Sequence, residues 1–357
     1  MSFSFGFAGD DIADDGQTSS VVKPTTAAAA TTSAFPVPGK PQLLPTAHQL
    51  SDLLAQLPSK IAYSLLDVTL DDGTTIQLPR RELWDVRVQL MAEEEDVAGA
   101  QSEGLGSHDV KTGVYEGGFK SWESSVDLVK VLAANNVTSA LGQKGLRVME
   151  LGCGTALPSL AVFQWATTST SEKKPLSLIM ADYNPSVLQL VTLPNFILSW
   201  ALNNPQIPAL QQAFSIEGEV ELGPDVLAAF ELSLKEANVT LSFVSGAWSQ
   251  EFVDLIYALP SSHDQERSTL LLGAETIYSP FALQAFLETL FLILEKEKTN
   301  GNEAAALVGA KRLYFGVGGS LDDFIDKARQ KGARVEQLRE EIEGVRRGVV
   351  QCVLGPT

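Results

Sequence analysis

Two glycines that follow an apolar stretch carry the clearest chemical signal in the chain. Residues 147–151 lead into Gly152 and Gly154, and Pro158 lies where a helix would begin. Glycine lets the backbone approach a ligand where a side chain would clash, and proline is favoured in the first turn of a helix. The pattern predicts a strand, a ligand-binding turn and a helix.

Three classes of ligand use such a turn, and the neighbouring residues distinguish them. A phosphate-binding P-loop needs a lysine that does not follow here. A dinucleotide fold favours a third glycine, and Leu157 occupies that position. Glu150, two residues before the first glycine, suits a ligand that carries positive charge and no phosphate. S-adenosylmethionine, with a sulfonium, an ammonium and ribose hydroxyls, is such a ligand.

An acidic residue at the end of the next apolar stretch supports a nucleoside ligand. Asp182 lies 28 residues after Gly154, and a polar insertion at 167–174 explains why this spacing exceeds the usual ~20. We expect the Asp182 carboxylate to bind the ribose hydroxyls, with Tyr183 and Asn184 lining the adenosine side. Asn184 is also placed to begin the helix that follows.

Apolar and amphipathic stretches alternate along the rest of the chain. The predicted helices cover residues 186–200 and 281–296, and the predicted strands cover residues 147–151, 176–181, 239–244, 269–273, 311–315, 333–338 and 349–354. This alternation indicates an α/β fold in which helices cover both faces of a parallel or mixed sheet. No long helix separates the last strands, which favours a closing antiparallel pair.

Composition divides the chain into a tail, an extension and a main domain. Residues 1–47 form an acidic, low-complexity tail, expected to be disordered. Phe3, Phe5 and Phe7 at its start fit either an unfolded end or a short strand or docking motif that packs on the folded body. Residues 115–357 carry the main α/β domain.

The extension at residues 48–114 has its own pattern. We expect helices at 48–57 and 80–94, separated by a hairpin that turns at Asp72 and Gly73. A polar stretch at 95–113 that contains glycine predicts a mobile loop.

The chain is strongly acidic. Its 26 Lys and Arg against 44 Asp and Glu give a formal net charge of −18, which argues against nucleic acid or an anionic membrane as partner and fits a basic protein. Two cysteines and three scattered histidines predict neither a disulfide framework nor a metal site. The longest apolar run, residues 187–202, is interrupted by Pro194 and Asn195, and the start lacks the pattern of a signal peptide. We therefore expect a soluble, intracellular protein.

Motifs across the chain resemble those of a known family. Together they are similar to a seven-stranded, S-adenosylmethionine-dependent protein methyltransferase with a Rossmann-like fold: ELGCG at 150–154, ADYNPSVL at 181–188, VSGAW at 244–248 and GAETIYSP at 273–280. Four more resemble eukaryotic histidine protein methyltransferases, most closely the fungal form: SFSFGF at 2–7, RRELWDV at 80–86, YEGGFKSWE at 115–123 and YFGVGGS at 314–320. The resemblance implies methylation of a histidine in a large-subunit ribosomal protein, at the tele nitrogen remote from the backbone, in cytoplasm and nucleus.

The resemblance and the motifs also imply roles for particular residues. Glu275 and Tyr278 are expected to orient the imidazole beside the methyl group, and Glu123 to pair with the ammonium of the cofactor. Glu150 would orient the glycine turn or that ammonium. The expected cofactor-binding residues are Ser121, Trp122, Glu123, Ser124, Glu150, Gly152, Gly154, Asp182, Tyr183, Asn184, Gly246, Trp248 and Glu275.

The chemistry favours histidine without excluding other functions. Methyl transfer from a sulfonium mainly requires alignment, and a histidine with a pKa near ~6.5 is largely neutral and nucleophilic at pH 7. A protein-lysine methyltransferase of the same branch remains an alternative, as does a non-catalytic chaperone of a basic ribosomal protein. A nicotinamide-dependent oxidoreductase is disfavoured by Leu157 and Glu150. The glycines at 316–319 fit either the border of a substrate channel or a tight strand exit.

Overall fold

The computed structural model describes residues 34–35, 41–96, 118–135, 137, 141, 144–169, 174–260 and 267–355. All of them belong to one unit, Thr31–Thr357. The aromatic motif at 2–7, most of the predicted tail and the predicted loop beyond Asp96 lie outside the described residues.

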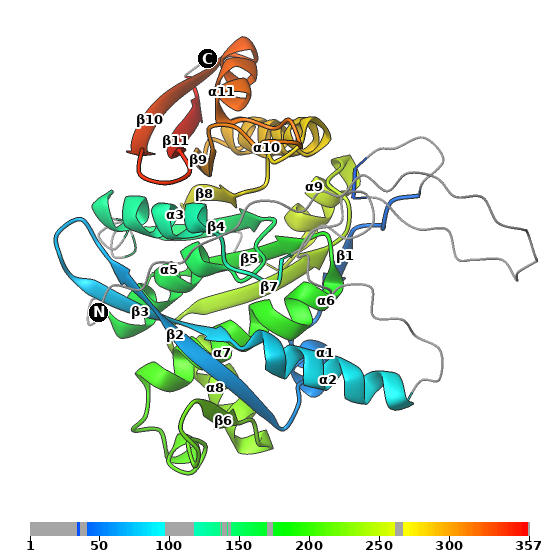
Figure 1. The fold of residues 1–357 in the computed structure, drawn as a ribbon, viewed down its shortest axis with the longest axis vertical. Coiled ribbons are helices and arrows are strands. Elements are labelled where there is room, and N and C mark those ends of the chain that lie inside the picture. Colours follow the sequence, from blue (N-terminus) through cyan, green and yellow to red (C-terminus); the bar gives the residue numbers. More distant parts are fainter. Residues whose placement is uncertain are drawn as a thin grey trace, which may run out of the picture. The chain divides into compact units, whose positions relative to one another are not determined.

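A central sheet of eight strands organises this unit (Figure 1). Its order is β1-β7-β5-β4-β8-β9-β11-β10, and the pairs from β7 to β9 are parallel while β1, β11 and β10 pair antiparallel. The strands are β1 (Thr46–His48), β4 (Gly145–Leu151), β5 (Leu176–Asp182), β7 (Val239–Ser245), β8 (Arg267–Ala274), β9 (Glu303–Lys311), β10 (Ala333–Glu341) and β11 (Arg347–Leu354). The predicted α/β class and the closing antiparallel pair are confirmed.

Two parts of the sheet differ from the prediction. β1 pairs with β7 through Thr46 opposite Ser245, so the end of the supposed disordered tail is ordered and adds an eighth strand to the expected seven. The strand predicted at 311–315 is wrong, because β9 begins at Glu303 and ends at Lys311. The alanines of β9 favour a helix by propensity, but pairing with β8 and β11 on either side selects a strand.

The alternation of side chains along the strands divides the core in two. Val148 and Leu178 belong to one apolar cluster, and their neighbours Met149 and Ile179 belong to the other. Successive residues of a strand point to opposite faces, so these strands are apolar on both. The helices of the first face are α3 (Glu123–Ala134), α5 (Leu157–Thr168), α7 (Leu193–Asn203) and α8 (Pro224–Glu236), and those of the second are α9 (Gln250–Ala258), α10 (Pro280–Thr299) and α11 (Leu321–Gln330).

A long apolar helical segment follows β5. It consists of α6 (Pro185–Val187), the π-helical turn η1 (Leu188–Thr192) and α7. Its length and composition would suffice to cross a membrane, but 78% of the apolar window is buried inside the structure, as in the core helix of a globular protein. Pro194 does not interrupt the segment as predicted, because it lies in the first turn of α7 directly after the wider π turn.

The N-terminal extension builds a second sheet. β2 (Lys60–Thr69) and β3 (Thr75–Arg81) form the predicted hairpin, and β6 (Glu219–Glu221) joins β2 on its other side. In Figure 1 the two blue strands run across the green helices, and β3 contacts α5 and α7. The flanking helices α1 (Leu50–Ala55) and α2 (Leu83–Asp96) begin later than predicted, the second because β3 continues to Arg81. A short 3-10 turn, η2 (Pro208–Leu210), precedes β6.

One buried asparagine connects this hairpin to the turn after β4. The Asn195 Oδ1 atom accepts a hydrogen bond from the Arg81 amide at 2.8 Å, and Nδ2 donates to the Thr155 carbonyl oxygen at 3.0 Å. Because Asn195 is fully buried, both bonds form away from water, where an unpaired amide would be costly. The extension and the glycine turn are thus held by the same side chain.

Candidate functional site

The carboxyl ends of the parallel strands meet at one edge of the sheet. β4 lies between β5 and β8, so the order of strand addition reverses there, and open α/β sheets bind ligands at such a point. A cavity of about 420 Å³ opens at this edge, a size usual for a small-molecule site. Its walls come from the turns after β4, β5, β7, β8 and β9 and from the start of α3.

The cavity collects many residues that the sequence analysis took from separate motifs. Of those predicted, the residues that line it are Trp122, Gly152, Gly154, Asp182, Tyr183, Gly246, Trp248, Glu275 and Tyr278. The others lie outside the lining, namely Ser121, Glu123, Ser124, Glu150 and Asn184.

The glycine turn after β4 has the backbone conformation that its sequence requires. Gly152 and Gly154 have φ angles of 67° and 50°, in the left-handed region that favours glycine. The Gly154 amide donates to Asp182 Oδ2 at 3.1 Å, and the Thr192 hydroxyl donates to the Gly154 carbonyl oxygen at 2.7 Å. A Cβ atom on Gly154 would lie 3.0 Å from the carbonyl oxygen of Gly118. The turn is therefore packed on one side and open to the cavity on the other.

Asp182 joins this turn to the end of β5. Its Oδ1 atom accepts from the Asn184 amide at 3.0 Å while Oδ2 accepts from Gly154. The side chain is buried but lines the cavity. Asn184 precedes α6 as predicted but makes no side-chain cap bond.

Glu150 faces the helix behind the turn rather than the cavity. Its Oε2 atom accepts from both the amide and the hydroxyl of Ser159 in α5, the amide at 3.1 Å. Complete burial raises the pKa of Glu150 to about 7. Of the two roles predicted for Glu150, the geometry supports orientation of the turn, because the carboxylate fixes the first turn of the helix that follows.

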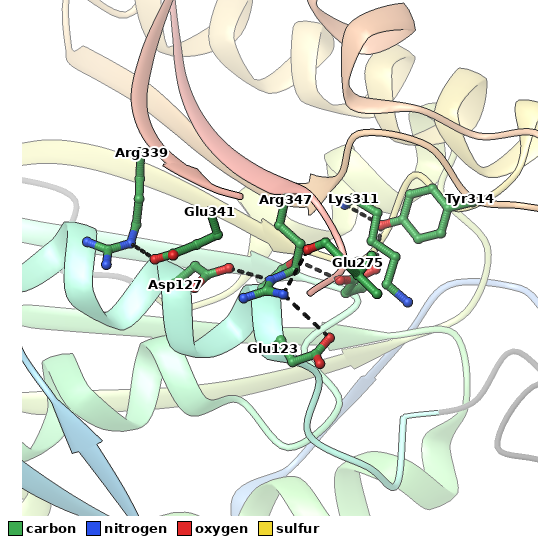
Figure 2. Close-up of polar contacts among 10 residues, drawn as sticks. Glu123, Asp127, Glu275, Lys311, Tyr314, Arg339, Glu341 and Arg347 are labelled. Atoms are coloured by element: carbon green, nitrogen blue, oxygen red, sulfur yellow. Dashed lines mark hydrogen bonds and ion pairs between the residues drawn. The ribbon is translucent and has the colours of Figure 1, made fainter. Parts of the chain in front are cut away.

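The residues just before α3 and in its first turn make hydrogen bonds to residues around the cavity. Ser121 lies 2.9 Å from Thr155 between their hydroxyl oxygens, and Ser124 donates to Glu275 Oε1 at 2.6 Å. Glu123, expected to pair with an ammonium, instead faces Arg347 at 4.0 Å (Figure 2). It lies outside the cavity lining because the first turn of α3 directs it toward the start of β11.

Glu275 directly follows β8 and places a buried carboxylate at the cavity wall. It has a φ angle of 58°, which is unusual for a residue with a side chain and indicates a conformation fixed by its surroundings. Ser124 donates to one carboxylate oxygen. The Tyr314 hydroxyl, which lies beside Glu275 in Figure 2, donates to the other. Burial raises the pKa of Glu275 above its ordinary value, and the charge of Lys311 and these two donors oppose this shift without reversing it.

Lys311 and Tyr314 were not among the predicted site residues. The Lys311 Nζ atom lies 5.2 Å from the ring centre of Trp122 and 5.7 Å from that of Tyr314, within cation–π range. Tyr314 belongs to the YFGVGGS motif, so a signal existed for it. Lys311 was misplaced at the start of a strand, and its position at the end of β9 depends on the register of the sheet.

An aromatic residue from the supposed disordered tail also lines the cavity. Phe35 is only 7% exposed, and its ring centre lies 6.3 Å from that of Trp248 and 6.2 Å from that of Tyr278. No periodicity around Phe35 indicated this contact. Among the described residues, the indole N–H of Trp248 is buried without a hydrogen-bond partner, and so remains available as a donor.

Cys153 is in the turn but not suited to nucleophilic chemistry. It is buried, and burial, with the charge of Asp182 adding to it, raises the pKa of the thiol well above its usual value. The thiol is therefore neutral and is not poised to act as a nucleophile.

The sheet order, the glycine turn and the acid at the end of the next strand define a Rossmann-like methyltransferase. Over 99% of this chain and 98% of the relative, the sequence is 34% identical to histidine protein methyltransferase 1 of Saccharomyces cerevisiae. It is 31% identical to the Schizosaccharomyces pombe protein of the same name over 87% of this chain and 85% of the relative. The chain belongs to the histidine protein methyltransferase 1 family and is a protein methyltransferase.

Two other comparisons add little. No family model matches the chain. Among solved structures, the N-terminal domain of human METTL16 in complex with SAH aligns with a TM-score of 0.36 and 10% sequence identity. The alignment covers 86% of this chain and 92% of the METTL16 chain. This likeness is too distant to inform the site.

Replacing Glu150 with glutamine should change how stability depends on pH. Because folding raises its pKa from 4.5 to about 7, the stability linked to the protonated side chain is complete below pH 4.5 and is lost as the pH rises through 7. We expect the unfolding free energy of the parent chain to fall by roughly 3 kcal/mol across this window relative to Glu150→Gln. Urea denaturation at several pH values measures this; parallel curves for the two proteins would contradict it.

Proposed function

We propose that this enzyme transfers the methyl group of S-adenosylmethionine to the tele nitrogen of a histidine in a large-subunit ribosomal protein. One observation carries the proposal: a single cavity joins the glycine turn and Asp182 to the buried carboxylate of Glu275. The first half suits a cationic nucleoside, and the second suits an imidazole that becomes positively charged.

The cofactor half fits S-adenosylmethionine by its chemistry. Asp182 presents a carboxylate at the cavity wall that suits ribose hydroxyls, and the glycine turn leaves room for the methionine portion. Lys120 and Lys311 line the cavity and supply positive charge for a carboxylate. The bound cofactor supplies a methyl group on a positively charged sulfur, which leaves as a neutral thioether.

On the substrate side, Glu275 is placed to orient the imidazole. A carboxylate accepts about four hydrogen bonds, and Ser124 and Tyr314 account for two of those at Glu275. We infer that Glu275 accepts the N–H of the imidazole nitrogen nearer the backbone. The lone pair of the remote nitrogen then faces the methyl group, and the negative charge stabilises the imidazolium as it forms.

The substrate inference follows charge and family. With a net charge of −18, this protein attracts a basic partner at long range, and ribosomal proteins are basic. Cytoplasm and nucleus, where such proteins are made and assembled, are the compartments that this proposal requires.

The proposal is tested by identifying the methylated residue. Incubation with methyl-labelled S-adenosylmethionine and dissociated large-subunit ribosomal proteins should yield labelled tele-methylhistidine, located by mass spectrometry. Methyl-lysine alone would assign the chain to lysine methylation. Tight binding of a ribosomal protein without any label would indicate the chaperone alternative.

Replacing Asp182 with alanine should weaken cofactor binding. A charge-assisted hydrogen bond contributes roughly 1.5–3 kcal/mol, so we expect Kd for S-adenosylmethionine to rise about 10- to 150-fold in calorimetry. Asp326→Ala, an exposed acid on α11, is the matched control and should leave Kd unchanged. An unaltered Kd in a folded Asp182→Ala protein would remove the ribose assignment.

Replacing Glu275 with glutamine should lower kcat while Kd for S-adenosylmethionine changes little. We expect a loss of about tenfold to hundredfold, since the imidazolium loses its counter-charge. Ser124→Ala keeps the charge but removes a donor that lowers the pKa of Glu275, so the acid limb of its kcat profile should move to higher pH. Equal kcat values for Glu275→Gln and the parent enzyme would rule out this role.

A further inference from the structure

Three bulky apolar side chains stand exposed at the wall of the cavity, and we call them the mouth patch. Leu313, Phe315 and Val345 all line the cavity, yet they are 47%, 83% and 45% exposed. Isolated exposed apolar residues are common, but a group at the opening of a cavity marks an interaction site. The reaction proposed above assigns no role to these residues.

The mouth patch is held on a fixed backbone. Two of its residues lie in the turn after β9, and Val345 lies in the turn between β10 and β11. The Arg312 amide donates to the Arg346 carbonyl oxygen at 2.9 Å and so joins the two turns. The Arg312 guanidinium also forms ion pairs with Asp322 and, at 3.4 Å, with Glu340. The apolar side chains are therefore presented by a braced surface, which limits the entropy lost when a partner binds.

We propose that the mouth patch binds the polypeptide that flanks the target histidine, through a bulky apolar side chain next to that histidine. The inference rests on the proposed function. Phe315 and Glu275 line the same cavity, so an imidazole beside Glu275 brings its own backbone and neighbouring side chains over the patch. The occupant is thus a segment continuous with the methylated residue.

The proposed contact between the mouth patch and the flanking segment is apolar rather than electrostatic. Among the described residues, the acids that line the cavity are Asp182 and Glu275, both buried, whereas Lys120 is exposed there. The acidic protein attracts a basic substrate at long range, but among the described residues that line the cavity the exposed ones are Lys120 and the three apolar residues of the mouth patch. Recognition of the flanking residue therefore depends on apolar contact.

The test replaces Phe315 with aspartate and compares it with Leu232→Asp. Leu232 lies on α8, away from the cavity lining, and is 56% exposed, so its replacement matches the chemical change. At limiting concentrations of dissociated large-subunit ribosomal proteins, we expect Phe315→Asp to lower the initial rate of methyl transfer at least tenfold. Leu232→Asp should keep the parent rate. Val345→Asp, on the neighbouring turn, should repeat the loss if Phe315→Asp does not fold.

Separate measurements distinguish the possible occupants. Calorimetry should give the parent Kd for S-adenosylmethionine with Phe315→Asp, and a weakened Kd would assign the patch to the cofactor instead. A faster rate in this variant would mean that the chain's own tail covers the patch, and loss of self-association in sedimentation would mean that a second copy does. Equal rates for all variants would overturn the proposal, whereas absence of label with the parent enzyme would overturn the proposed function itself.

Discussion

The hydrogen bond from the Gly154 amide to the Asp182 carboxylate is the constraint on which the cavity depends. It requires β4 and β5 to end side by side, and the parallel register that places Leu151 opposite Ala181 achieves this. Thr192 then fixes the Gly154 carbonyl oxygen from the helical segment behind. The turn is held by the neighbouring strand and the following helix, so its shape does not rely on a bound ligand.

Two buried carboxylates near this turn show how local partners decide ionisation. Among the described residues, the hydroxyl and amide of Ser159 oppose the effect of burial on Glu150, and its pKa reaches about 7. Burial raises the pKa of Glu275 as well, and Lys311, Ser124 and Tyr314 oppose this shift without reversing it. The first can carry a proton near neutral pH as a structural group. At Glu275 the nearby charge and donors favour the carboxylate form, which is the form that can accept an imidazole proton.

The sequence predicts the parts of the site that depend on local chemistry. The glycine turn and Asp182 are recognisable because their residue types follow directly from backbone conformation and ligand charge. Lys311 is not, since its position depends on where β9 ends, and that end is set by pairing with β8 and β11. The direction of Glu150 depends on strand parity: it shares a face with Val148, toward α5, and the sequence alone does not say which face borders the cavity. Phe35 has no pattern around it, because its contacts come from residues far along the chain.

The two hydrogen bonds of Asn195 limit where this enzyme can be truncated. A fragment that began at residue 115 would lack Arg81, so a buried amide oxygen would lose its donor, and α5 and α7 would lose the strand that covers them. The sequence suggests a boundary at residue 115 between the N-terminal extension and the main domain. In the folded structure these contacts cross that boundary. Removing the residues before 115 would therefore remove part of the structure that supports the glycine turn.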